Sequence, residues 1–185
     1  MSNFKNNLTY FTYFKKTLDK FTEIDPREIN FQNRIIIPLL EDILSDRESI
    51  SVVDVSNQYK SSTNHTRDSY AGIHTPDLLI AENWNYKNNN NSSINYIALV
   101  EVKSPILEPI NFENLNQHTK NEISCYLELQ ERVILTDCIR WCFYTKSHEN
   151  IVYDLSDILD ANEYENDPQK WSELCNYIKT FLSDF

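Results

Sequence analysis

Apolar residues follow helical spacing in four parts of the chain. Near the N-terminus they recur every three or four residues, which predicts an amphipathic helix over residues 3–21. A second such run follows Asp25-Pro26, where Asp25 is expected to cap a helix and proline to fill its first turn. Pro38 predicts a kink in this helix. Two more helices are predicted: one over residues 112–131, and one that starts at Asp167-Pro168 and turns Trp171, Leu174, Ile178 and Phe181 inward.

Shorter apolar runs predict the strands of a β-sheet. Residues 51–55 alternate, and continuous apolar runs begin at Leu78 and Ile97, as in strands with at least one buried face. Residues 133–144 predict a hairpin that turns near Asp137-Cys138. Together these elements predict one α/β domain with a central mixed sheet and helices on both faces. Polar segments between them predict a loop over residues 56–69 and a hairpin tip over residues 87–93.

Composition narrows the class of protein. Of the 185 residues, 41% are hydrophobic and 12% aromatic, which is typical of a globular domain. The single glycine, Gly72, excludes Gly-rich phosphate-binding loops. The sequence has no run of about 18 apolar residues and no signal-peptide core at its start, so we expect a cytoplasmic protein without a membrane partner. Four cysteines lack metal-binding or redox spacing and are expected to be buried free thiols: Cys125, Cys138, Cys142 and Cys175.

The negative charge is concentrated near the C-terminus. The net charge of the chain is −11, of which residues 149–185 carry −7, because they contain nine acids and two lysines. A charge of this sign opposes nucleic-acid binding, so its position matters. We expect the acidic segment to be a solubilising face, although it could also repel DNA or bind a partner.

Two carboxylates and a lysine are the candidate chemistry of this chain. Asp77 opens the strand at residues 78–81, while Glu101 and Lys103 lie near the end of the next strand. The two-residue period of a strand puts Glu101 and Lys103 on one face, and a hairpin would bring Asp77 beside them. Paired carboxylates repel each other unless a hard cation such as Mg²⁺ lies between them. A lysine beside that metal could orient a water molecule for attack on a phosphate.

The order Pro76-Asp77, strand, Glu101-Val102-Lys103 resembles the motif of the PD-(D/E)xK nuclease superfamily. Glu28, Gln32 and Arg34 before Ile36-Ile37-Pro38-Leu39-Leu40 also resemble the opening helix of the nuclease domain at the N-terminus of type I restriction enzyme R subunits. The resemblance covers about residues 25–146. It implies a restriction-endonuclease-like fold and a Mg²⁺-dependent DNA endonuclease, with Mn²⁺ as a substitute, that acts in restriction or phage defence.

The resemblance also implies roles for individual residues. Asp77, Glu101 and the carbonyl of Val102 would bind the metal, Lys103 would position the water, and the carboxylate of Glu28 would reach toward the metal.

The family carries a glutamine four residues before a tyrosine on a later helix. Here Tyr126 is preceded at that distance by Glu122, so either Glu122 replaces the glutamine or Gln117 acts with His118 from another turn.

The hairpin at residues 135–144 resembles another family motif, with Cys138 where glycine is usual. Because cysteine tolerates positive φ poorly, we expect a different turn geometry.

Several questions stay open at this point. Lys60 and Arg67 are candidate substrate contacts in the loop, and Lys16 and Lys20 could join them and Lys103 in lining the approach. The acidic segment is then expected to face away from the catalytic opening. An alternative function is a catalytically silent nuclease-like module that binds a protein partner through this segment. A homodimer, an RNase and a branched-DNA resolvase are also compatible with the motif.

Overall fold

The computed structural model describes residues 7–56, 70–85, 93–160 and 167–183. Six strands form one sheet in the order in which they occur in the chain. Neighbouring strands are antiparallel except β3 and β4, which are parallel, so the sheet is mixed as predicted. The strands are β1 Ile50–Asp54, β2 Leu78–Glu82, β3 Asn95–Val102, β4 Arg132–Thr136, β5 Arg140–Thr145 and β6 Ile151–Asp154.

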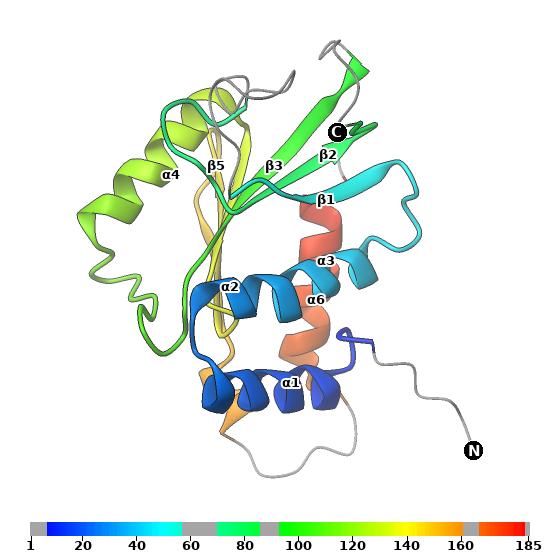
Figure 1. Cartoon of the computed structure of the whole chain (residues 1–185), viewed down its shortest axis with the longest axis vertical. Coiled ribbons are helices and arrows are strands. Elements are labelled where there is room, and N and C mark those ends of the chain that lie inside the picture. Colours follow the sequence, from blue (N-terminus) through cyan, green and yellow to red (C-terminus); the bar gives the residue numbers. More distant parts are fainter. Residues whose placement is uncertain (1–6, 57–69, 86–92, 161–166, 184–185) are drawn as a thin grey trace.

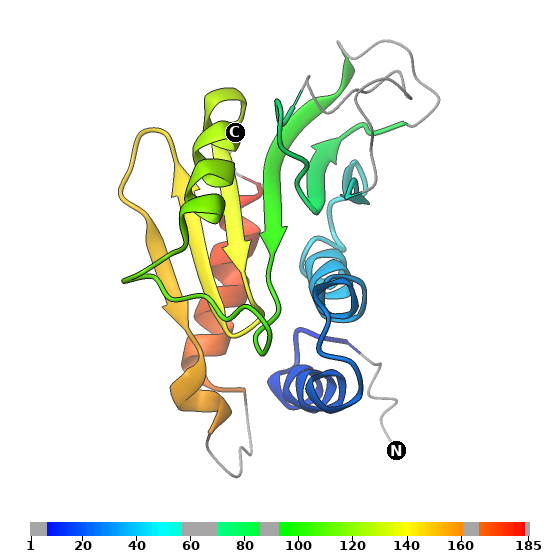
Figure 2. The same cartoon turned by 60° about the vertical axis from the view of Figure 1, so that its left-hand side comes forward.

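Helices cover both faces of the sheet, which confirms the predicted α/β architecture (Figures 1 and 2). One face packs against α1 (Phe11–Ile24), α3 (Ile37–Ile43) and α6 (Gln169–Phe181), together with α2 (Glu28–Phe31) and the π-helix η1 (Gln32–Ile36) that precede α3. The short helix α5 (Ser156–Leu159) joins the same core through Leu159. The other face packs against α4 (Gln117–Leu129).

Helix α4 lies in the connection between the two parallel strands. Parallel neighbours cannot be joined by a tight turn, so the chain leaves the end of β3, crosses the sheet and returns along α4 to begin β4. This crossover sets α4 against the end of β3 that carries Glu101.

Both terminal helices belong to the core. Phe14 of α1 and Trp171 of α6 have ring centroids 4.3 Å apart, and the indole nitrogen of Trp171 donates a hydrogen bond to the carbonyl of Thr9 at 2.6 Å. The hydrophobic core therefore extends beyond residues 25–146 at both ends. The ammonium of Lys15 on α1 reaches the carbonyl of Leu159 at the end of α5.

The predicted start of the second helix was wrong. Helix α1 continues to Ile24, and α2 begins only at Glu28, so Asp25 ends α1 instead of capping the start of the second helix. The reason is local: Arg27 binds the carboxylate of Asp25, with Nη2 at 2.5 Å from Oδ2, and occupies the group that would have capped the helix.

The helix that begins at Glu28 departs from α-helical geometry about one turn before Pro38, where a kink was predicted. Residues 32–36 form a π-helix, and Pro38 then stands in the first turn of α3, where its missing N–H is tolerated. The π-helix turns Gln32 inward while Asn33 and Arg34 remain exposed.

The β4–β5 hairpin turns at Asp137-Cys138 as predicted, but the expectation that cysteine avoids positive φ there was wrong. Cys138 has a φ of 72°, in the left-handed region usual for glycine. Its N–H donates to Oγ1 of Thr136 at 3.0 Å, and its carbonyl accepts from the indole of Trp141 at 3.1 Å. The buried carboxylate of Asp137 accepts from the N–H of Arg140 at 2.6 Å. These bonds hold the turn in its strained conformation.

Further predictions have mixed outcomes. The strands β1, β2 and β3 and the helix α6 lie close to their predicted positions, whereas β6 and α5 were not foreseen. The predicted hairpin tip falls largely, and the loop almost entirely, outside the described residues. All four cysteines are free; Cys138 and Cys142 are buried, while Cys125 and Cys175 are half-buried. Among the described residues no helix is both long and apolar enough to cross a bilayer.

Candidate active site

The β2–β3 pairing brings Asp77 and Glu101 to the same place. Leu78 pairs with Val100 in antiparallel register, so Asp77 lies opposite Glu101 one step further along the strands. Residues opposite each other in such a pair point to the same face of the sheet. That face is the one covered by α4, because Leu79 and Leu99 pack in the core beneath it.

Glu101 and Lys103 share this face, as the two-residue period predicted. Nζ of Lys103 lies 2.6 Å from Oε1 of Glu101. Their relative exposures are 7% for Lys103 and 4% for Glu101, and that of Asp77 is 9%, so the three charges sit in a largely dry environment. The N–H of Lys103 donates to the carbonyl of Thr136 at 2.8 Å, which continues the β3–β4 ladder and fixes the backbone of the lysine.

Asp77 is held by the backbone of the neighbouring strand. Its Oδ2 accepts a hydrogen bond from the N–H of Val102 at 2.7 Å. Burial and the nearby charge of Glu101 nevertheless raise the pKa of Asp77 to about 8. Two carboxylates opposite each other thus cannot both ionise easily near neutral pH without added positive charge.

Helix α4 supplies the next contact to Glu101. The hydroxyl of Tyr126 donates to Oε2 of Glu101 at 3.1 Å, so each carboxylate oxygen of Glu101 has a donor. Burial raises the pKa of Glu101 to about 7 despite Lys103 and this hydroxyl. The same surroundings, burial first and the charge of Glu101 second, raise the pKa of Tyr126, which therefore keeps its proton.

Glu122 brings a third carboxylate, one turn before Tyr126 on α4. Its Oε2 is buried without a hydrogen-bond partner among the described residues and lies 3.8 Å from Nζ of Lys103. Its other oxygen lies 3.2 Å from Nε2 of His118. Of the two alternatives for the family's glutamine, Glu122 lies beside Lys103, and His118 lies against the other oxygen of Glu122.

Sequence reasoning missed His74. Its ring lies 6.1 Å from that of His118 and meets the ring of Tyr126 edge-on at 6.4 Å, measured between centroids. His74 stands three residues before Asp77 in the segment that leads into β2, and this position was the signal that could have identified it.

Glu28 approaches the same group of charges from α2. The loop after β3 is tied to the start of that helix, because Oγ of Ser104 donates to the carbonyl of Pro26 at 2.5 Å. Burial raises the pKa of Glu28, and the charge of Lys103 acts against that shift. The next residue on the same side of the helix, Gln32, is buried with its amide nitrogen unpaired among the described residues.

The remaining candidates fall elsewhere. Gln117 is exposed at the start of α4 and donates to Oδ1 of Asn121 at 2.8 Å, away from Glu101. Val102 turns its side chain into the opposite core, so its only route to a ligand is its backbone. Lys60 and Arg67 lie outside the described residues.

The carboxylates present fit a hard cation with few protein ligands. The described residues contain no preformed group of three or more acid, histidine or cysteine ligands. Mg²⁺ usually keeps several waters and takes only one or two carboxylates from a protein. The facing pair Asp77 and Glu101, with its raised pKa values, meets that requirement.

The described part of the acidic segment lies away from these residues. Helix α6 packs on the face of the sheet opposite α4, where Trp171, Leu174 and Ile178 join the core (Figure 2). The charges that shift the pKa of Glu28 belong to Lys103, Glu108 and Glu122, none of which is in this segment.

Comparisons with known proteins support the fold. No family model matches the sequence, and no curated protein matches it. A chain of the DrdV–DNA complex, determined by cryo-EM, superposes with a TM-score of 0.55 at 14% identity, over 92% of this chain and 94% of that one. A DUF820 protein from Anabaena variabilis, described as a candidate nuclease, gives a TM-score of 0.42 at 15% identity, over 84% of this chain and 81% of its own. The chain has a restriction-endonuclease-like fold.

Proposed function

We propose that this protein is a Mg²⁺-dependent endonuclease that hydrolyses phosphodiester bonds in DNA. The observation that carries the proposal is the buried group at the end of the β2–β3 hairpin, where Lys103 binds Glu101 and Asp77 lies opposite it. A structural role alone is a poor account of this group, because burying several charges costs free energy that apolar residues would not.

Asp77, Glu101 and the carbonyl of Val102 would hold the metal. Mn²⁺ has similar ligand preferences and is expected to replace Mg²⁺. When bound, the ion would activate water and neutralise charge on the phosphate. The protein's part is to hold two acids in place through the N–H of Val102 and the hydroxyl of Tyr126.

Lys103 would act as a cation and hydrogen-bond donor. Burial acts to lower the pKa of Lys103, but the charges of Glu101, Glu28 and Glu122 together raise it, so the proton stays on Nζ. A protonated lysine cannot accept a proton from water, but it can orient the water and stabilise negative charge on the phosphate. Its bond to Glu101 fixes the ammonium for this purpose.

Glu28 and Glu122 would complete the charge balance around the lysine. Glu28 faces it from α2 and would add a second carboxylate face to the metal site, while Glu122 faces it from α4. In this arrangement Glu122 takes the place that a glutamine has in the type I R subunit nuclease domains.

DNA is the substrate favoured by the comparison, because the neighbour with the same fold was determined as a DNA complex. A role in restriction or phage defence follows from the motif resemblance and is part of the proposal. The acidic segment offers less support for a partner-binding module, because the apolar stripe of α6 is already buried in the core.

A digestion panel tests the proposal. The purified protein is incubated with supercoiled plasmid, single-stranded DNA, branched DNA and RNA, with Mg²⁺, with Mn²⁺ and with EDTA. We expect metal-dependent cleavage of DNA and none with EDTA. Cleavage confined to RNA or to branched DNA would change the substrate, and no cleavage by the folded protein would favour the catalytically silent module.

A further inference from the structure

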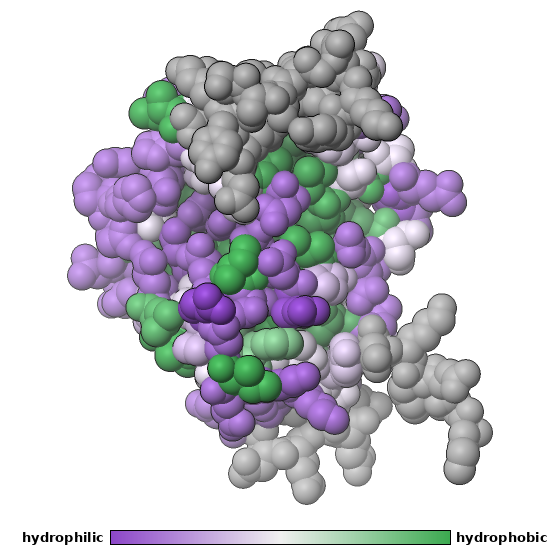
Figure 3. All heavy atoms as spheres, in the orientation of Figure 1, coloured by the Kyte–Doolittle hydropathy of each residue, from purple (hydrophilic) through white to green (hydrophobic). Residues whose placement is uncertain are grey.

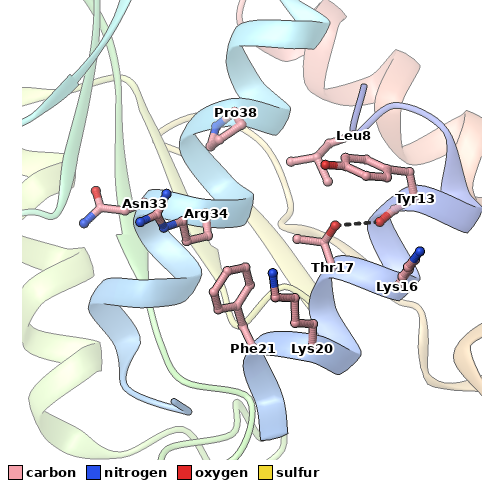
Figure 4. Close-up of a pocket in the computed structure, with 9 residues that line it drawn as sticks. All are labelled: Leu8, Tyr13, Lys16, Thr17, Lys20, Phe21, Asn33, Arg34 and Pro38. Carbon is pink, nitrogen blue, oxygen red and sulfur yellow. Dashed lines mark hydrogen bonds between the residues drawn. The ribbon is translucent and has the colours of Figure 1, made fainter. Parts of the chain in front are cut away.

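A second candidate site lies between α1 and the helix formed by η1 and α3. This pocket has a volume of about 390 Å³, and none of its lining residues belongs to the candidate active site. Its charged and amide groups come from two helices: Lys16 and Lys20 from α1, and Asn33 and Arg34 from η1. Figure 4 shows Lys20 extending from α1 into the space between the two helices, while the end of Lys16 points outward.

The pocket gathers three cations that have no acidic partner among the described residues of this acidic protein. Its lining includes three cations and no acid, although the whole chain has a net charge of −11. Within the described part of the chain, Lys16, Lys20 and Arg34 form no ion pair. Of the ten other lysines and arginines of the described residues, five are paired with acids: Arg27, Lys103, Arg140, Lys170 and Lys179.

The aromatic ring of Phe21, which lines the pocket, lies close to the ammonium of Lys20. Nζ of Lys20 lies 5.4 Å from the ring centroid of Phe21, close enough for a cation–π interaction at the edge of the pocket. Lys16 and Lys20 are four residues apart, which places them on one side of α1 about 6 Å from each other along its axis. Figure 3 shows hydrophilic and hydrophobic residues interspersed over this part of the surface.

The solvent exposure of the polar residues that line the pocket indicates which class of ligand it would bind. Lys16, Lys20, Asn33 and Arg34 line the pocket from the surface, so it offers cations at its rim and no buried donor at its base. A small phosphate ligand needs desolvated, converging donors to bind tightly, whereas a polyanion gains affinity from several exposed cations that displace its counterions.

The pocket is connected to the candidate active site through one helix. Helix α2 carries Glu28 and leads directly into η1, which carries Arg34. Six residues correspond to about 9 Å along a helix axis, and a DNA strand advances about 3.4 Å per nucleotide. A strand bound at the active site could therefore reach the pocket within a few nucleotides.

We infer that the pocket binds the phosphate backbone of the DNA on one side of the cleaved bond. The inference rests on the proposed endonuclease function and deepens it by assigning Lys16, Lys20 and Arg34 as backbone contacts. Each cation binds one phosphate, and Asn33 donates an additional hydrogen bond. The contacts are independent of base sequence and position the duplex relative to Asp77 and Glu101.

A salt-dependence experiment tests the inference. Binding of a labelled duplex is measured by fluorescence anisotropy in EDTA at several salt concentrations, for the wild type and for the triple variant K16Q/K20Q/R34Q. The slope of log K against log salt is negative. It should become less steep by about 0.9 for each phosphate that is no longer neutralised, and so by about 2 to 3 in total. A control variant with the same change of charge, K146Q/K170Q/K179Q, should keep the wild-type slope, because its residues lie outside the pocket.

The outcomes separate this inference from the proposed function. If the wild type cleaves and binds DNA but the triple variant has the wild-type slope, the inference is wrong and the nuclease proposal stands. If the wild type neither binds nor cleaves DNA, both are wrong. If the triple variant loses only the binding of inorganic phosphate, measured by calorimetry, the pocket holds a small anion and the DNA contact is rejected.

Discussion

Nζ of Lys103 lies 2.6 Å from Oε1 of Glu101, and both side chains are buried where the β2–β3 hairpin meets α4. An ion pair in this position is costly to form and costly to break, because removing either partner leaves an unpaired buried charge. The proposed chemistry also requires one positive and one negative group side by side, and Lys103 and Glu101 supply them.

The substitution K103M is expected to abolish most of the cleavage while the protein remains folded. Methionine keeps the length of the side chain but cannot orient water or stabilise charge, so the rate should decrease by about 10²- to 10⁴-fold. Plasmid cleavage and circular dichroism measure the two effects. K120M, at an exposed lysine of α4, is the control and should cleave like the wild type. Near-normal cleavage by K103M would remove the lysine from the mechanism.

The stability of the metal-free protein should fall as the pH rises from about 4 to about 8. The pKa values of Asp77 and Glu101 are raised to about 8 and about 7 in the folded protein, from 3.8 and 4.5. The folded state therefore binds more protons than the unfolded state between these limits, and its advantage is lost as both acids ionise. Melting temperatures in EDTA at pH 5 and pH 8 measure the change.

Two comparisons attribute this pH dependence to the carboxylates. D77N removes one of the acids, so its melting temperature should decrease less between pH 5 and pH 8 than that of the wild type. Added Mg²⁺ should stabilise the wild type more at pH 8 than at pH 5, because binding requires ionised carboxylates. The same decrease in D77N as in the wild type would exclude Asp77 as the titrating group.

Loss of the Tyr126 hydroxyl should destabilise the protein. Y126F removes the donor to Oε2 of Glu101 and leaves that oxygen unsatisfied in a buried site, at a cost of about 1–3 kcal/mol in the free energy of unfolding. The matched control is Y96F, because the buried hydroxyl of Tyr96 has no hydrogen-bond partner among the described residues. Urea denaturation should show a smaller loss, or a gain, for Y96F. Equal effects would mean that the bond to Glu101 adds nothing.

The residues around Lys103 illustrate what the sequence could predict. The two-residue period of a strand was enough to place Glu101 and Lys103 on one face, and two adjacent apolar runs were enough to predict the β2–β3 hairpin that sets Asp77 opposite Glu101. These features depend on local backbone geometry, which a single sequence carries. The metal, the water and the roles of Glu28 and Val102 remain predictions.

Other features could not be predicted because they depend on distant contacts. The π-helix at residues 32–36 adds less than one residue to a turn, a change too small to alter the apolar pattern. Cys138 adopts a positive φ because Thr136, Trp141 and Asp137 hold the turn, and these bonds form only after the sheet has folded. Strand β6 has the sequence Ile-Val-Tyr-Asp and is mostly exposed, so its three apolar residues form a run too short to identify a strand.

The C-terminal helix should be required for stability. W171A removes a side chain that is 1% exposed and packs on Phe11 and Phe14, which should cost about 3–5 kcal/mol in the free energy of unfolding. S172A, at the next and exposed position of α6, should change it by less than about 0.5 kcal/mol. Chemical denaturation distinguishes the two. An unchanged midpoint for W171A would indicate that α6 is a peripheral element, as a partner-binding module would require.

The most direct measurement is the rate of Mg²⁺-dependent nicking of supercoiled plasmid by the wild type and by D77N. Asp77 is chosen because it lies opposite Glu101 and is held by the N–H of Val102, so asparagine keeps the shape of the site and removes its charge. The account predicts nicking by the wild type that EDTA stops, a rate at least about 100-fold lower for D77N, and wild-type activity for E131Q, which changes an exposed acid after α4. Equal nicking by D77N and the wild type, or nicking that persists in EDTA, would contradict it.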